Sequence, residues 1–140
     1  MKKIIFVVLA MVFVYATSPA QGKVPKSVET AFNVKFPKAI KVKWEKENKH
    51  EYEANFMQNG LNYSANFSDL GEWFETESLI TFDELPLKIQ TVFNSNHKEE
   101  KIKAVAKIET SKGDTQYEIE IKKGLKTVEY IYNSIGELIK

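Results

Sequence analysis

The stretch VPKSVETAFN, Val24 to Asn33, decides the fold because the chain contains it twice. The second copy, LPLKIQTVFN, begins at Leu85, sixty-one residues later, and keeps the proline, the threonine and the final Phe-Asn pair. Where the first copy has an apolar residue, the second copy also has one. Similar alternating segments follow each copy, so the chain is predicted to be a tandem repeat.

Each copy is predicted to form a helix that packs on a sheet. The first copy carries apolar residues at helical spacing on one face, namely Val28, Ala31, Phe32 and Phe36. Pro25 suits the first helical turn, and Pro37 ends the helix because the residue before a proline avoids the α region. The second helix is expected from Pro86 to about Asn96, after a capping-box pattern at Thr81–Glu84.

Segments that alternate apolar and polar residues follow the first helix, which is typical of an antiparallel sheet covered on one face. The residues expected to face the helix are Ile40, Val42, Trp44, Tyr52, Ala54, Phe56, Tyr63, Ala65, Phe67 and Trp73. Asn59-Gly60 predicts a two-residue hairpin that sets Phe56 opposite Tyr63. The loop Asp69–Gly71 is expected to set Phe67 opposite Trp73.

A turn near Glu47–Lys49 is expected to pair Trp44 with Tyr52 on the covered face. On the other face the same register would place Lys43 opposite Glu53. Strands in the second repeat are predicted near Lys101–Thr110, Thr115–Lys122, Lys126–Asn133 and Glu137–Lys140. Here one face is expected to carry Ile102, Ala104, Ala106 and Ile108 together with Tyr117, Ile119, Ile121, Val128, Tyr130 and Tyr132.

The predicted fold class is therefore α+β, with an α-β-β-β-β unit that occurs twice. The first repeat is assigned to residues 21–80 and the second to residues 81–140. One helix on one small sheet is marginally stable by itself, so the two halves are expected to share a core or a sheet.

Residues 1–20 are predicted to be a signal peptide. Lys2 and Lys3 precede thirteen apolar residues, Ile4 to Ala16, and small residues then suggest cleavage before Gln21. A membrane anchor would need about 20 apolar residues. No cysteine follows, which argues against a lipoprotein, so we expect a periplasmic or secreted protein without stable membrane insertion after cleavage.

Composition limits the partners of the mature chain. All twenty basic residues are lysines, and removal of Lys2 and Lys3 leaves eighteen lysines against nineteen acidic residues. A balanced surface without arginine argues against nucleic acid as a partner. The chain has no cysteine, so no disulfide stabilises it and no thiolate can act as a nucleophile.

The motifs of the first repeat resemble a known family. They are V-P-x-x-V-x-x-x-F, then F-P-x-A-x-x-V-x-W at Phe36–Trp44, then Y-E-A-x-F at Tyr52–Phe56, followed by an N-G turn and a G-E-W turn. This order resembles the PepSY-like, or β-lactamase-inhibitor-like (BLIP-like), small exported proteins of Gram-negative bacteria. The resemblance covers nearly all of the mature chain. In the second repeat it is weaker, because His97, Lys98 and Ala106 stand where the first has Phe36, Pro37 and Trp44.

The resemblance implies a tandem helix-on-sheet fold similar to that of β-lactamase inhibitory protein, which presents a concave sheet to its target. It does not imply that this chain inhibits a β-lactamase.

No pattern of catalytic or metal-binding residues stands out. His50 and His97 lack partners at metal-ligand spacing and are interpreted as surface residues. Glu51 with Glu53 and Glu118 with Glu120 are paired carboxylates, expected to form cross-strand charge pairs opposite Lys43 and Lys107. We therefore expect a protein that is not an enzyme and holds no cofactor or metal. A hydrolase is the third hypothesis.

The polar side of the sheet, which we call the open face, is the candidate contact surface. Strand parity places five apolar residues there among polar ones, and the candidate contact residues are Met57, Phe74, Val105, Ile131, Ile139, Lys43 and Glu53. An aromatic anchor ringed by polar groups is typical of an interface hot spot. The leading hypothesis is a module that binds an envelope or secreted protein through this face. The alternative is a small-ligand or envelope-component binder with a pocket between the two repeats.

Overall fold

A computed structural model describes residues 23–140. The predicted signal peptide and the cleavage position before Gln21 lie outside these residues. The first half contains one helix and four strands, which are α1 (Lys26–Lys35), β1 (Ile40–Asn48), β2 (Glu51–Gln58), β3 (Leu61–Ser68) and β4 (Trp73–Leu79). Both the helix and the four strands of the first predicted unit are present.

The second half has three strands rather than the four predicted. Its elements are a 3₁₀ turn η1 (Phe82–Glu84), α2 (Leu87–Asn96), β5 (Lys101–Thr110), β6 (Thr115–Lys123) and β7 (Lys126–Asn133). The expected strand at Glu137–Lys140 is reduced to one bridge between Leu138 and Tyr132. The Thr81–Glu84 capping box forms, but it caps η1, whereas α2 starts directly after Pro86.

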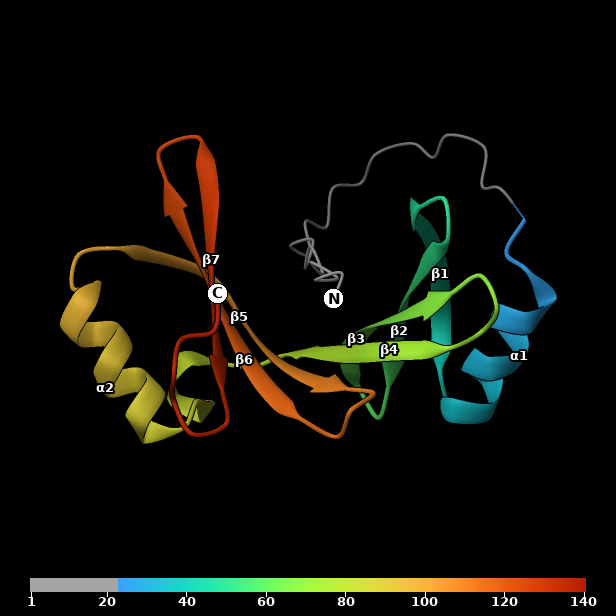
Figure 1. Cartoon of the computed structure of the whole chain (residues 1–140), viewed down its shortest axis with the longest axis horizontal. Coiled ribbons are helices and arrows are strands. Elements are labelled where there is room, and N and C mark those ends of the chain that lie inside the picture. Colours follow the sequence, from blue (N-terminus) through green and yellow to red (C-terminus); the bar gives the residue numbers. More distant parts are fainter. Residues whose placement is uncertain (1–22) are drawn as a thin grey trace, which may run out of the picture.

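All seven strands form one antiparallel sheet in chain order from β1 to β7. Strand β4 pairs with β5 from Glu75↔Thr110 to Leu79↔Ala106, so the two halves share a continuous sheet. Both helices lie on the same side of this sheet, at its opposite ends, and the sheet curves between them (Figure 1). The open face is therefore the inner side of the curve.

The core under α1 is mainly aromatic. Phe32 is 2% exposed, and its ring lies 5.1–6.1 Å from those of Trp44, Phe56 and Phe67. The edge-to-face geometry of these contacts is the one aromatic pairs prefer. The remaining buried members of this cluster are Val24, Val28, Tyr52, Ala54 and Ala65.

The core under α2 is mainly aliphatic, although Phe93 occupies the position equivalent to Phe32 and is 1% exposed. Its buried members are Leu85, Ile89, Phe93, Val105, Ile119, Ile121 and Tyr132. The Phe that the two copies of the helix motif share is therefore buried in both halves.

A bulge in β5 changes the predicted faces of the second half. The register with β6 shifts between Ile102 and Ala104, and Val105 then pairs with Ile119. Val105 consequently lies in the core under α2, so its predicted place on the open face is wrong. Ala104, Ala106 and Ile108, which parity placed toward the helix, lie on the open face instead. A bulge inserts one extra residue and reverses the alternation beyond it.

The register of the first half is partly as predicted. Phe56 faces Tyr63 and Phe67 faces Trp73. The predicted first turn is wrong by two residues, because the turn is Lys49-His50 and Trp44 therefore pairs with Ala54 rather than Tyr52. Ile40 and Val42 are exposed, since a second bulge with Lys41 at φ 56° precedes Lys43.

Candidate functional site: an acidic open face

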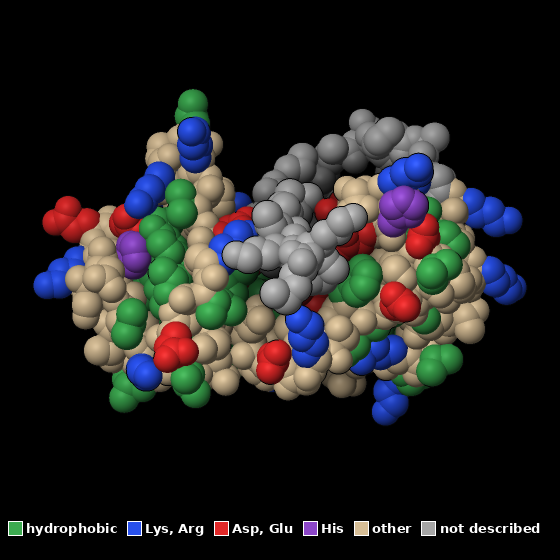
Figure 2. Space-filling model, viewed as in Figure 1, with side chains coloured by type: hydrophobic (Ala, Val, Ile, Leu, Met, Phe, Trp, Pro, Cys, Tyr) green, Lys and Arg blue, Asp and Glu red, His purple; other side chains and the backbone are tan. Residues whose placement is uncertain are grey.

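The open face carries carboxylates from both halves of the molecule. Strands β1, β2 and β4 contribute six glutamates, and β6 and β7 contribute three. They are Glu45, Glu47, Glu51, Glu53, Glu75, Glu77, Glu118, Glu120 and Glu129. Asn55, Ser64 and Asn66 lie among the glutamates of the first half. Acidic side chains are visible near the middle of the molecule in Figure 2.

Like charges lie directly opposite each other at two places on this face. Glu45 pairs with Glu53 between β1 and β2, and Glu120 pairs with Glu129 between β6 and β7. Like charges at directly opposed positions destabilise a sheet. At the second place the repulsion is offset, because Lys103 and Lys140 form ion pairs with Glu120 and Glu129.

The charge pairs predicted for these glutamates are wrong. Lys43 lies opposite Asn55 rather than Glu53. Lys107 pairs with Tyr117 and Ser78 and belongs to the helix side of the sheet, whereas Glu118 lies between Ala106 and Ile131. The corrected registers replace the expected lysine–glutamate pairs by carboxylates that face polar, apolar or acidic neighbours.

Burial and mutual repulsion hold protons on the central carboxylates. Burial raises the pKa of Glu77 to about 9, and the charges of Glu118 and Glu75 add to the shift. Burial raises the pKa of Glu53 to about 8, with a further contribution from Glu47. These groups therefore lie across the middle of the open face as carboxyls that resist ionisation.

Glu118 shows the same effect in the second half. Burial raises its pKa to about 8, the charges of Glu129 and Glu120 raise it further, and Lys140 opposes the shift. The residue is 3% exposed, and its Oε2 atom is buried without a hydrogen-bond partner within residues 23–140. A side-chain hydrogen bond with Glu120 contributes to the same rise in the pKa of Glu118.

Two lysines meet carboxylates at the second-half border of this face. Lys103 Nζ lies 2.9 Å from Glu120 Oε2, and Lys140 Nζ lies 3.2 Å from Glu129 Oε2. Both contacts show that an ammonium group fits against this surface at hydrogen-bond distance.

The seven predicted contact residues are only partly brought together. Glu53, Lys43, Met57 and Ile131 lie on the open face by register. Ile131 is 5% exposed and exchanges backbone hydrogen bonds with Ile139 and Lys140, so it is no exposed anchor. Ile139 itself is half exposed, at 51%.

Phe74 lies in a bulge of β4, because Trp73 pairs with Phe67 and Glu75 pairs with Asn66. The residue is half-buried, and its carbonyl accepts a hydrogen bond from Ser111 N in the next hairpin. Trp73 packs against the core under α1 and donates from Nε1 to Thr76 Oγ1. The predicted inward orientation of Trp73 is confirmed, while the role of Phe74 as an anchor stays a prediction.

Sequence reasoning missed the acidic character of the open face. Four strands carry a Glu-x-Glu pattern, and that repeated pattern was the available indication. It occurs at Glu45–Glu47, Glu51–Glu53, Glu75–Glu77 and Glu118–Glu120. The Glu-x-Glu pattern indicates an acidic face only when all seven strands form one sheet.

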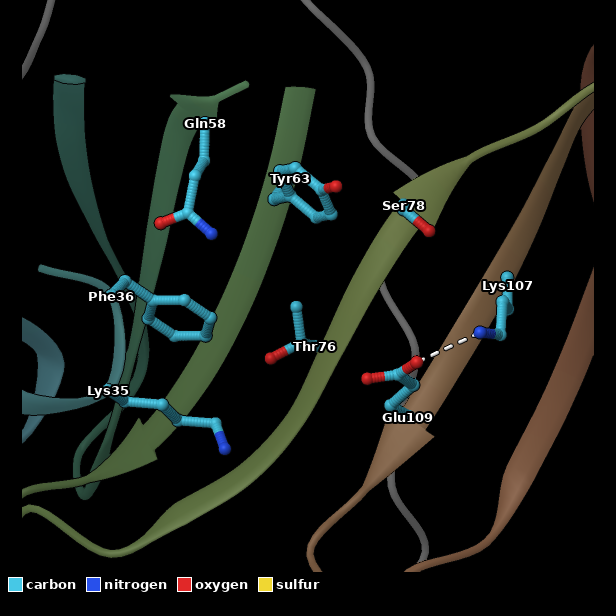
Figure 3. Close-up of a pocket in the computed structure, with 8 residues that line it drawn as sticks. All are labelled: Lys35, Phe36, Gln58, Tyr63, Thr76, Ser78, Lys107 and Glu109. Atoms are coloured by element: carbon cyan, nitrogen blue, oxygen red, sulfur yellow. Dashed lines mark hydrogen bonds and ion pairs between the residues drawn. The ribbon is translucent and has the colours of Figure 1, made fainter. Parts of the chain in front are cut away.

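A pocket lies on the helix side of the sheet at the junction of the two halves. Its volume is about 360 Å³, and its walls are Lys35, Phe36, Gln58, Tyr63, Thr76, Ser78, Lys107 and Glu109. Figure 3 shows these side chains around a shared space, with Lys107 directed at Glu109, whose Oε1 is 2.9 Å from the lysine nitrogen. Lys35 Nζ lies 3.4 Å from the centre of the Trp73 ring.

The two histidines each contact one carboxylate. His50 Nδ1 lies 2.8 Å from Asp69 Oδ2, and His97 Nδ1 lies 2.8 Å from Glu100 Oε2. His97 also stacks on Phe93, which explains how it replaces Phe36 in the second repeat. Within residues 23–140, no group of three or more histidine, aspartate and glutamate side chains could hold a metal ion. No helix in this part of the chain is long and apolar enough to cross a membrane.

Comparison with known proteins identifies a family and a fold. The family model described as "Putative beta-lactamase-inhibitor-like, PepSY-like" matches residues 16–61 and 50–140. No curated protein matches the chain.

Solved structures from several Bacteroides species have the same fold. A DUF2874 family protein from Bacteroides ovatus is 25% identical, with a TM-score of 0.73 over 85% of this chain and 87% of the other. A protein from Bacteroides eggerthii described as "putative periplasmic" is 22% identical, with a TM-score of 0.75 over 85% and 88% of the two chains. A BLIP-like protein from Bacteroides fragilis is 21% identical, with a TM-score of 0.71 over 86% of each chain.

Proposed function

Because the chain belongs to the β-lactamase-inhibitor-like, PepSY-like family, we propose that it is an exported, non-enzymatic module that binds a protein partner through the open face. The observation that carries this proposal is the continuity of that face. Seven strands contribute to it, both helices leave it uncovered, and its curve suits a rounded partner surface.

The location is a second part of the proposal. The Bacteroides eggerthii protein of this fold is described as periplasmic, and the N-terminal sequence of the present chain has the order of a signal peptide. We propose a periplasmic or secreted protein. The Bacteroides fragilis protein is described as BLIP-like, which supports a binding role and leaves the target open.

Site-specific photocross-linking tests this proposal. A photoreactive amino acid at Asn55, which lies on the open face in β2, should give a cross-linked protein adduct in the envelope of the native host, and mass spectrometry would identify it. The matched control is the same amino acid at Asn94, which is exposed on α2 on the opposite side of the sheet. Equal cross-linking from both positions, or none from Asn55, would show that the open face is not the surface that binds a protein partner.

The junction pocket favours a second candidate function, the binding of a small polar ligand. Two ammonium groups, one carboxylate, three hydroxyls and two aromatic rings line it, and the Oε1 atom of Gln58 is buried without a partner in the described chain. Such a mixture is typical of sites that orient a small molecule by a few polar contacts. A thermal-shift screen against small organic acids and sugars would test it, with Lys35→Met as the pocket variant and Lys38→Met as the exposed control. A hit that raises the melting temperature of the Lys35→Met variant as much as that of the wild type would not bind in this pocket.

A further inference from the structure

The junction pocket on the helix side of the sheet offers more hydrogen-bond donors than acceptors. Lys35 Nζ lies over the ring of Trp73, a contact that uses none of its three N–H donors, and within residues 23–140 it forms no ion pair. Glu109 is the one carboxylate that lines the pocket, and Lys107 already donates to it. A ligand that matches this pocket must therefore supply acceptors.

The neutral groups of the pocket add to the excess of donors. Thr76 Oγ1 accepts a hydrogen bond from Trp73 Nε1 at 2.9 Å, so its own O–H is left as a donor. The amide nitrogen of Gln58 and the hydroxyls of Tyr63 and Ser78 have no hydrogen-bond partner in the described part of the chain. An ammonium group on a ligand would find few acceptors here, whereas a carboxylate and hydroxyls would find many donors.

The walls of the pocket suit a ligand with a saturated ring. Phe36 and Tyr63 line one side of the space, and Lys107 and Glu109 line the other (Figure 3). Both aromatic rings are held in place by the buried ring of Phe56, whose centre lies 4.7 Å from that of Phe36 and 5.6 Å from that of Tyr63. One wall is thus apolar and fixed before binding, and the opposite wall is polar, as in sites that orient a small molecule.

We propose that the junction pocket binds a sugar acid, a six-membered sugar ring that carries a carboxylate, and this inference rests on the small-ligand function proposed above. The carboxylate of the ligand would accept hydrogen bonds from Lys35, which has no carboxylate partner of its own within residues 23–140. The hydroxyls of the ring would exchange hydrogen bonds with Tyr63, Ser78 and Glu109. The contact with the ammonium group would be the strongest of these, because hydrogen bonds between charged groups are stronger than those between neutral groups.

Isothermal titration calorimetry at pH 7 with D-glucuronate, D-galacturonate and D-mannuronate tests the inference. At least one of these uronates should bind the wild-type protein. The parent hexose of that uronate has the same ring without the carboxylate and should bind about tenfold more weakly, the loss expected for one hydrogen bond between charged groups. D-Glucosamine, which carries an ammonium group, should not bind. Equal affinity for a uronate and its parent hexose, or no binding of any uronate, would overturn the inference.

A lysine pair locates the carboxylate in the pocket. Lys35 and Lys38 are both exposed, so neither substitution removes a core contact. Lys35→Met should weaken uronate binding about tenfold, whereas Lys38→Met should change it less than about twofold. The melting temperatures of the ligand-free variants check that both are folded. Equal effects of the two substitutions would reduce the binding to general charge attraction and reject the pocket as the site.

Glu109→Gln should have the opposite effect. It removes the one negative charge of the pocket, releases Lys107 from its ion pair and keeps a carbonyl acceptor at the same place. Uronate binding should become about threefold tighter, in line with the modest energy of an exposed charge pair. Glu99→Gln, at an exposed glutamate outside the pocket, should leave the affinity unchanged. Weaker uronate binding by Glu109→Gln would contradict an anionic ligand.

Competition and the ligand screen separate the remaining outcomes. If inorganic phosphate displaced the uronate at equal concentration, the pocket would recognise charge alone and the sugar ring would be rejected. If a neutral compound bound in a manner that depends on Lys35 while no uronate bound, the small-ligand function would stand and the sugar acid would be rejected. If no compound of either kind bound, both proposals would fail together.

Discussion

The two halves of the molecule place similar helix sequences on one continuous sheet, but the cores beneath the two helices are packed differently. Under α1, Phe32 lies among the rings of Phe36, Trp44, Phe56 and Phe67, and four strands carry the cluster. Under α2, Phe93 contacts Phe82, His97 and Tyr130 at the border of an aliphatic core on three strands. The difference teaches that the repeated motif specifies where a helix docks, while the strand residues decide how the space beneath it is filled.

Truncation of the two equivalent phenylalanines should have the largest effect. Removing a buried phenylalanine typically costs about 3–5 kcal/mol, since it leaves a cavity in a close-packed core. We expect Phe32→Ala to reach the upper part of this range and Phe93→Ala the lower part, because Phe32 has more aromatic neighbours. Urea denaturation would measure both.

Val34→Ala is the control for this pair, because Val34 is 78% exposed on α1. It should change the free energy of unfolding by less than about 0.5 kcal/mol. A larger loss from Phe93→Ala than from Phe32→Ala would reverse the comparison of the two cores.

Two glycines at corresponding loops should respond differently to alanine. Gly71 and Gly136 both have positive φ, at 88° and 83°, so each substitution carries left-handed strain of about 1–2 kcal/mol. A Cβ atom on Gly71 would lie 2.7 Å from the backbone oxygen of Ser27 in α1, whereas one on Gly136 would meet only the flexible side chain of Lys88. Gly71→Ala should therefore lower the melting temperature more than Gly136→Ala does.

Gly60→Ala isolates the conformational part of this effect. Gly60 has φ 81°, and no atom lies within 4 Å of the position that a Cβ atom would take, so its loss should equal that of Gly136→Ala. Equal melting temperatures for the Gly71 and Gly60 variants would show that a Cβ atom at Gly71 does not clash with α1.

The acidic open face should make the stability of the protein depend on pH, and this effect should be smaller than those of the substitutions above. The pKa of Glu77 is raised to about 9 and those of Glu53 and Glu118 to about 8, from an ordinary value of 4.5. A carboxyl whose pKa is raised by folding stabilises the protein at pH values below its unfolded-state pKa. This stability is lost as the pH rises through the folded-state pKa. The melting temperature should therefore fall from pH 5 to pH 9.

Glu77→Gln should flatten this fall, because it removes the group with the largest shift on the face. Around Glu77 the relevant charges are those of Glu75 on its own strand, Glu53 on β2, and Glu118 and Glu120 on β6. The exposed residue Glu29 serves as the control, and Glu29→Gln should leave the slope unchanged. A melting temperature that rises toward pH 9 in the wild type would contradict the predicted protonation of the face.

Much of the fold follows from local patterns, and the exceptions have physical causes. Helical spacing and the flanking prolines predicted both helices, and Asn59-Gly60 predicted the register of its hairpin. The bulge in β5 was missed, although three consecutive apolar residues, Ala104 to Ala106, interrupt the alternation at this place in the sequence. Parity alone does not show which of them faces the helix, because the shift arises from pairing with β6. That one bulge moved Val105 from the candidate contact surface into the core.

The candidate site was less predictable than the fold. Residues such as Met57 and Glu53 were placed on the correct face by parity, but cross-strand neighbours depend on turn length. A two-residue error at Lys49-His50 turned the expected Lys43–Glu53 attraction into the Glu45–Glu53 repulsion that the structure contains. The acidic face emerges only when strands far apart in the chain lie side by side.

The two edges of the sheet have a consequence for self-association. A free strand edge offers unpaired backbone groups to any other chain, which is a common route to aggregation. Here residues 137–140 occupy the outer edge of β7 from Ile131 to Asn133, where Ile131 N donates to Lys140 O and Ile139 N donates to Ile131 O. At the other end, the bulge at Lys41 interrupts the edge of β1. A neighbouring copy would therefore have to displace a paired segment or follow a kinked strand to extend this sheet into a fibril.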